Sequence, residues 1–117
     1  METEIRAVNV RLGREARLQM DRNVRLTMDR FGGRIRRLVV SVSDVNGPRG
    51  GIDKRCRIIA DLGRAGAVVA GGAGETVWEA AAAAAGRLKT TLVRMLESRR
   101  DLRRRHRPDP RERHPAA

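Results

Sequence analysis

Few side chains in this sequence could take part in acid–base, nucleophilic or metal chemistry. The only histidines, His106 and His114, lie near the C-terminus, without a second cysteine or a nearby carboxylate cluster to complete a metal site. The single cysteine, Cys56, falls on the apolar side of an alternating stretch, and no histidine is placed to activate its thiol. We interpret it as a buried structural residue. The sequence therefore predicts no enzymatic activity, no metal or other cofactor, and no small-molecule substrate.

Two further patterns raise the question of a phosphate site and of an acid pair. Residues 71–74 (Gly-Gly-Ala-Gly) precede an expected helix whose free amides could bind an anion. They lack the Lys-Ser/Thr of a P-loop and the βαβ setting of a dinucleotide fold, so we interpret them as a permissive turn. Asp44 and Asp53 flank residues 46–51, where Asn-Gly and Gly-Pro predict a loop. We expect a hairpin held by turn chemistry there rather than an acid pair.

The arginines give the strongest chemical signal. Lys and Arg number 26 against 14 Asp and Glu, a formal charge of +12, and only Lys54 and Lys89 are lysines. A guanidinium binds phosphate through two parallel hydrogen bonds, so this excess predicts a polyanionic partner. A GC-rich genome would favour Arg over Lys, but it would not produce the net positive charge. Because aromatic residues make up only 2% of the chain, RNA contacts should depend on charge and shape rather than on base stacking.

A single domain must position these arginines, because 117 residues suffice for one domain and not for two ordinary ones. Alternating and helical periodicities predict an α+β fold of the order β-α-β-β-β-α. In this fold a four-stranded sheet with antiparallel hairpins carries both helices on one face. The strands are expected at residues 5–10, 35–43, 54–62 and 67–70, and the helices at residues 14–31 and from 76 to about 105.

The first expected helix has an apolar face and a basic face. Gly32 and Gly33 are expected to end it, since glycine reaches the left-handed cap conformation without steric penalty. Leu18 and Leu26 fall outside the apolar stripe. The stripe consists of Ala16, Met20, Val24, Met28 and Phe31, and the opposite side carries Arg14, Arg22 and Arg25.

The second expected helix begins with a capping box, Thr76 followed by Glu79. Arg87 and Arg94, seven residues apart, share its outer face. Arg99 falls on the apolar stripe, so the last turns should leave the domain. The stripe itself consists of Val77, Ala81, Ala84, Leu88, Leu92 and Met95.

The chain is expected to divide into a domain at residues 1–102 and a disordered basic tail at residues 103–117. The tail contains Pro108, Pro110 and Pro115 and has no apolar periodicity.

The lone cysteine fits a reducing compartment. Residues 1–6 do not resemble a signal peptide, and no apolar run approaches the ~20 residues of a membrane span. We therefore expect a cytoplasmic protein without a membrane partner.

Two segments carry a resemblance to a known family. Residues 44–56 (Asp-Val-Asn-Gly-Pro-Arg-Gly-Gly-Ile-Asp-Lys-Arg-Cys) are similar to a signature of one proteobacterial branch of the ribosome hibernation-promoting factor and ribosome-associated inhibitor family, also called the sigma-54 modulation family. Residues 66–78 (GAVVAGGAGETVW) align without gaps to that family's fourth strand and the start of its second helix, with Trp78 where the family usually has Tyr. The likeness covers residues 5–100 and is to the short form, without the long form's dimerisation domain.

The resemblance implies a double-stranded-RNA-binding-like domain and a ribosome-associated translation inhibitor that is a monomer off the ribosome. It would bind small-subunit rRNA in the decoding channel and block mRNA and tRNA in stationary phase. Arg87 and Arg94 match basic positions of the family's second helix, whereas Thr90 replaces a usually basic residue and Ala82 a common Asp. The expected RNA-binding residues are Arg87, Lys89 and Arg94, with Arg14, Arg22 and Arg25 of the first helix included on geometry.

Two other functions remain open at this point. One is a general double-stranded nucleic-acid-binding protein, because any basic α+β domain has a similar sequence profile. The other is a protein-interaction adaptor in transcription regulation.

Overall fold

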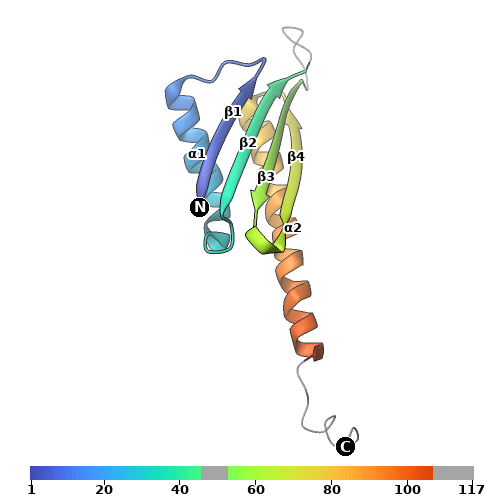
Figure 1. Ribbon diagram of the computed structural model, residues 1–117. Coiled ribbons are helices and arrows are strands. Elements are labelled where there is room, and N and C mark those ends of the chain that lie inside the picture. Colours follow the sequence, from blue (N-terminus) through green and yellow to red (C-terminus); the bar gives the residue numbers. More distant parts are fainter. Residues whose placement is uncertain (46–52, 107–117) are drawn as a thin grey trace, which may run out of the picture.

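Four strands form one mixed sheet in the order β1-β2-β3-β4, and two helices cover one of its faces (Figure 1). The computed structural model describes residues 1–45 and 53–106, and the side chains of that part up to Ser98. The predicted α+β class and the order β-α-β-β-β-α are confirmed. The elements are β1 (Glu2–Val8), α1 (Arg14–Met28), the 3-10 turn η1 (Asp29–Phe31), β2 (Arg37–Asp44), β3 (Lys54–Asp61), the 3-10 turn η3 (Gly63–Ala65), β4 (Ala67–Gly74) and α2 (Val77–His106).

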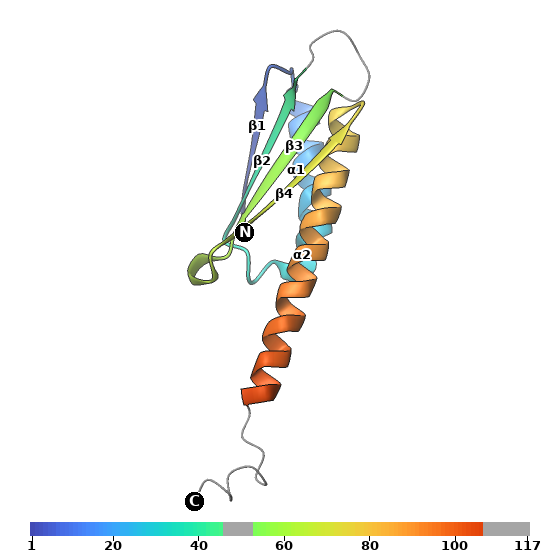
Figure 2. The same ribbon diagram turned by 90° about the vertical axis from the view of Figure 1, so that its right-hand side faces the viewer.

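The sheet combines a parallel pair with two antiparallel hairpins. β1 runs parallel to β2, with α1 as the crossover between them, and the pairs β2–β3 and β3–β4 are antiparallel. The predicted alternation in β2 is confirmed, because Leu38, Val40 and Val42 are buried on the helix-covered face. Figure 2 shows that neither helix covers the other face of the sheet.

The ends of β1 differ from the prediction. The strand spans Glu2–Val8 rather than residues 5–10. Its earlier start follows from the parallel register, which pairs Glu2 with Arg37 at the beginning of β2. Its earlier end follows from Asn9, whose φ of 58° is left-handed and breaks the extended conformation.

α1 buries the predicted stripe but ends in a different way. Met20, Val24 and Met28 are buried, together with Phe31 in η1, whereas Leu18 and Leu26, which fall outside the stripe, are exposed. The predicted left-handed glycine cap is wrong, because Gly32 is in the right-handed helical region with φ −51°. A 3-10 turn ends the helix instead, and the N–H of Gly32 donates to the carbonyl oxygen of Asp29. That bond satisfies one of the free carbonyls at the helix end.

β4 continues through the glycines that were predicted to form a turn. It extends to Gly74 and pairs with β3 along its whole length. A Cβ on Gly72 would lie 2.5 Å from the carbonyl oxygen of Ala80 and 2.5 Å from the backbone nitrogen of Ala84. The turn prediction is therefore wrong, because these glycines are strand residues, and Gly72 among them lets α2 approach the sheet closely.

The capping box of α2 is confirmed. The Thr76 hydroxyl accepts a hydrogen bond from the N–H of Glu79 at 3.1 Å, and the Glu79 carboxylate accepts one from the N–H of Glu75 at 2.9 Å. The helix continues beyond the sheet to His106 (Figure 2), past the predicted domain boundary at residue 102. Arg and Leu favour helix, and the first proline in this region is Pro108. The rest of the predicted tail and the predicted loop at 46–51 lie outside the described residues.

Within the described part of the chain, no helix has the length and hydropathy needed to cross a bilayer.

Candidate nucleic-acid interface

The uncovered face of the sheet carries two exposed arginines on β3. Arg55 and Arg57 alternate with the buried residues Cys56 and Ile58, so they project from the face opposite the helices. Two residues apart on a strand, they are separated by roughly 7 Å. This spacing is of the same order as that between successive phosphates of a nucleic-acid strand.

Small and polar residues surround these arginines. In the sheet register, Ser43 and Ser41 on β2 lie beside Arg55 and Arg57, and Ala73 and Gly71 lie beside them on β4. The resulting open hollow has a volume of about 760 Å³. Because its neighbours are short, the hollow leaves both guanidiniums accessible to a ligand as wide as a nucleic-acid backbone.

Arg87 reaches the same hollow from α2. Its Nη1 donates a hydrogen bond of 2.9 Å to the carbonyl oxygen of Gly71. Since β4 is an edge strand, this bond fixes the guanidinium at the margin of the sheet. The remaining N–H groups stay available for an anion, and charge-assisted hydrogen bonds of arginine to phosphate are among the strongest in proteins.

A second hollow, of about 700 Å³, continues along the groove between β4 and α2. It shares Val69, Gly71 and Arg87 with the first hollow, and Arg94 lies in it further along the helix. We refer to Arg55, Arg57, Arg87 and Arg94 as the basic edge. In the part of the chain that the structure describes, no Asp or Glu lines either hollow. Among the described residues, none of these guanidiniums forms an ion pair, so the positive charge of the basic edge is not neutralised internally.

The six predicted RNA-binding residues do not share one surface. Arg87 and Arg94 lie together on the basic edge. Lys89 follows Arg87 by two residues, roughly 200° around the helix. It lies one turn after Ala85, which lines the groove between α1 and α2. Lys89 is therefore exposed on the α1 side of α2, away from the basic edge.

The arginines of α1 lie on the other flank of the domain. α1 packs against β1, whereas α2 packs against β4 and β3. Arg14, Arg22 and Arg25 are exposed on α1, and Arg25 is paired with Asp21 at 2.9 Å. The helix pair thus separates the α1 arginines from the basic edge.

Arg55 and Arg57 were not among the predicted site residues. The alternation in β3 already placed them on the face opposite Cys56, so a signal was present. What the alternation could not show is that this face is uncovered and that Arg87 comes to its edge from α2.

The other potentially reactive groups have structural roles. Lys54 Nζ lies 3.1 Å from an oxygen of Asp44 and 3.1 Å from an oxygen of Asp53, so a lysine bridges the two carboxylates at the ends of β2 and β3. The pKa of Lys54 is raised, first by the hydrogen bond that it donates to Asp44 and then by the one that it donates to Asp53.

Cys56 is buried as predicted, and burial raises the pKa of its thiol to about 12. Such a thiol carries almost no thiolate near neutral pH.

The fold is similar to that of a ribosomal subunit interface protein of known structure. The structure of such a protein from Coxiella burnetii superposes with a TM-score of 0.64 at 11% sequence identity, covering 83% of this chain and 99% of that chain. No protein-family model and no curated protein sequence matches the chain. At 11% sequence identity, this likeness shows a shared fold alone.

Proposed function

We propose that this protein binds the small ribosomal subunit through its rRNA and inhibits translation by occupying the channel for mRNA and tRNA. Binding alone would block the channel, so no chemical step is involved. Such a protein works in the cytoplasm and silences ribosomes when growth stops. The observation that carries the proposal is the basic edge, where Arg55, Arg57, Arg87 and Arg94 line two continuous hollows. No carboxylate of the described side chains lines these hollows.

The chemistry of the basic edge favours the RNA backbone as the ligand. Phosphate contacts supply most of the sequence-independent affinity of nucleic-acid-binding proteins. None of the described residues that line the two hollows is aromatic, so unpaired bases would find no stacking partner among them. The hydroxyl groups of Ser41 and Ser43 can donate to phosphate oxygens beside the guanidiniums. The fold shared with a ribosomal subunit interface protein supports the ribosome as the source of that RNA.

Co-sedimentation with purified small subunits at increasing salt tests the proposal. Arg87→Gln combined with Arg94→Gln should weaken binding and reduce the slope of log affinity against log salt by roughly 0.7–0.9 for each phosphate that the protein no longer neutralises. The matched variant, Arg22→Gln combined with Arg25→Gln, removes the same charge from α1. A larger loss of affinity in this second variant would assign the interface to α1 instead of the basic edge.

Two outcomes would decide against the ribosomal proposal itself. Equal affinity for an isolated RNA duplex and for the small subunit would indicate a general double-stranded nucleic-acid-binding protein. Binding that is unchanged between low and moderate salt would exclude the electrostatic mechanism and favour a protein-interaction adaptor.

A further inference from the structure

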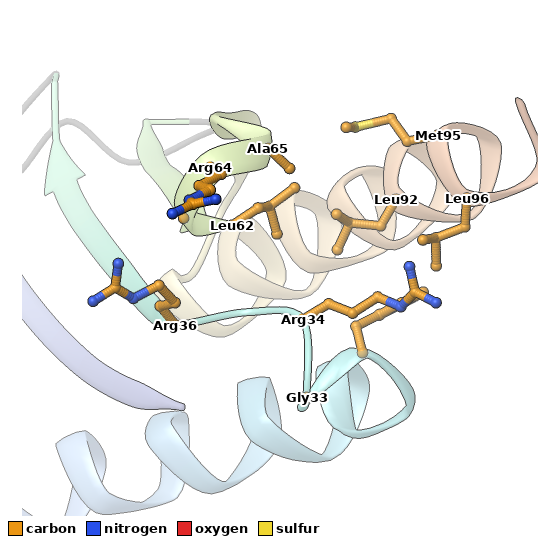
Figure 3. Close-up of a pocket in the computed structure, with 11 residues that line it drawn as sticks. Gly33, Arg34, Arg36, Leu62, Arg64, Ala65, Leu92, Met95 and Leu96 are labelled. Carbon is orange, nitrogen blue, oxygen red and sulfur yellow. The ribbon is translucent and has the colours of Figure 1, made fainter. Parts of the chain in front are cut away.

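A third hollow lies at the end of the sheet where η1, η3 and α2 meet, and it differs in chemistry from the basic edge (Figure 3). Its volume is about 410 Å³. Phe31 and Leu92 form its buried floor, and Leu62, Met95 and Leu96 are partly exposed around them. It shares no lining residue with the two hollows of the basic edge, so a ligand here and RNA there could be bound together.

Three arginines surround this apolar floor. In Figure 3, Arg34 extends toward Leu96, and Arg36 and Arg64 lie on the side of Leu62. Among the described residues, their guanidiniums form no hydrogen bond or ion pair, and no Asp or Glu lines the hollow. The hollow is therefore an apolar site with a positively charged rim.

The position of one rim arginine depends on a glycine. Gly63 has a φ of +68°, and the Cδ of Arg36 lies 3.0 Å from the place that a Cβ on Gly63 would occupy. The aliphatic stem of Arg36 thus packs over the η3 turn, close to the backbone. The nearby carboxylate of Asp61 accepts a hydrogen bond of 2.8 Å from the N–H of Gly63, which stabilises the same turn. Packing and turn geometry together place Arg36 at the rim.

We propose that this hollow is a docking site for an acidic segment of a protein partner. A large apolar side chain of that segment inserts between Leu62, Leu92 and Met95. Flanking Asp or Glu residues of the segment face Arg34 and Arg64. An apolar anchor surrounded by charge-complementary pairs is the usual arrangement of a specific protein contact.

Charge complementarity excludes the basic occupants that the chain itself could provide. Residues 103–117 hold six arginines against Asp109 and Glu112, so the rim would repel the chain's own C-terminal segment. A second copy carries the same net charge of +12 and would also be repelled.

RNA is a poorer fit for a different reason. An extruded base needs hydrogen-bond partners for its polar edge. Apart from the arginines, the lining side chains offer only alkyl groups, one phenyl ring and one thioether. An aliphatic or aromatic side chain of a protein has no such requirement.

Titration of the methyl-labelled full chain with the acetylated peptide Asp-Glu-Leu-Phe-Asp-Glu tests the proposal by NMR. We expect shifts at the methyl groups of Leu62, Leu92, Met95 and Leu96. Two comparison peptides separate the contributions, one with Ser-Ser in place of Leu-Phe and one with Lys in place of every acid. Both should bind at least about tenfold more weakly, since each lacks either the apolar anchor or the ion pairs.

Protein variants test the same contacts from the other side. Arg34→Gln combined with Arg64→Gln should weaken peptide binding by about tenfold, because two exposed ion pairs are removed. Met95→Gln should weaken it by a similar factor while leaving thermal unfolding nearly unchanged. The control, Arg11→Gln combined with Arg14→Gln, removes equal charge elsewhere and should bind the peptide normally.

Three results would overturn the proposal. The first is the absence of methyl shifts with the acidic apolar peptide. The second is equal binding of the Ser-Ser peptide, which would show non-specific charge attraction. The third is displacement of the peptide by a short single-stranded oligouridylate that shifts the same methyl groups, which would identify the hollow as part of the RNA interface.

Discussion

Replacing Gly72 by alanine tests how closely α2 lies on the sheet. The new Cβ would be 2.5 Å from both the carbonyl oxygen of Ala80 and the backbone nitrogen of Ala84, and 2.8 Å from the Cβ of Ala83. An ordinary contact needs at least 3.4 Å, so the backbone of α2 would have to move by roughly 0.9 Å. The obstructing atoms are mainly helix backbone, which cannot rotate away as a flexible side chain can.

The magnitude follows from this geometry. Overpacking a well-packed core typically costs about 1–3 kcal/mol. Because the clash with α2 is with its backbone, we expect the upper end of that range, about 3 kcal/mol. For a domain of this size, that destabilisation lowers the midpoint of thermal unfolding by at least about 10 °C.

Two glycines of the same chain provide matched controls. A Cβ on Gly71, the preceding residue of β4, would meet only the carbonyl oxygen of Cys56 at 3.7 Å, so Gly71→Ala should change stability by less than about 0.5 kcal/mol. A Cβ on Gly86, inside α2, has nothing within 4 Å, and Gly86→Ala should stabilise the protein by about 0.5–1 kcal/mol.

Urea and thermal unfolding monitored by circular dichroism measure all three variants. Equal stability of the Gly72→Ala and Gly71→Ala variants, with an unchanged denaturant slope, would refute the close packing of α2 on β4.

Two further predictions concern the buried thiol and the bridging lysine. Cys56, with its pKa raised to about 12 by burial, should resist alkylation by iodoacetamide near pH 8 in the native state and react only on unfolding; rapid labelling of folded protein would contradict its burial. Because the folded pKa of Lys54 is raised, its contribution to stability is complete at neutral pH and is lost only as pH rises through that pKa, above its ordinary 10.5. Lys54→Met should destabilise the protein near pH 7, since Asp53 is buried and would keep an unpaired charge. Urea unfolding measures the deficit, and an unchanged unfolding midpoint in the variant would contradict this explanation.

Elements with strong local signals were predicted from the sequence. The capping box of Thr76 and Glu79 and the apolar stripe of α2 depend on residues three or four positions apart, which interact within a single helix. The alternation in β2 and β3 likewise depends only on the pleat of each strand. By contrast, residues 71–74 have turn-like composition, and only their pairing with β3 and the packing of α2 against them make them a strand. The end of α1 was also not predictable, because a 3-10 turn and a left-handed glycine cap use the same two glycines.

The sequence alone predicts the class of partner, whereas the surfaces that would contact that partner depend on the tertiary structure. Net charge is a property of composition, so the sequence alone predicts a polyanion as partner. Local periodicity shows which residues share a face of one element, but not which faces of different elements meet. Only the tertiary structure separates Arg22 and Arg25 from Arg87 and brings Arg87 from α2 to the edge of β4, beside Arg55 and Arg57. It likewise collects Arg34, Arg36 and Arg64 around an apolar floor, because the connection from η1 to β2, the connection from β3 to β4, and α2 meet only when the sheet and α2 pack together.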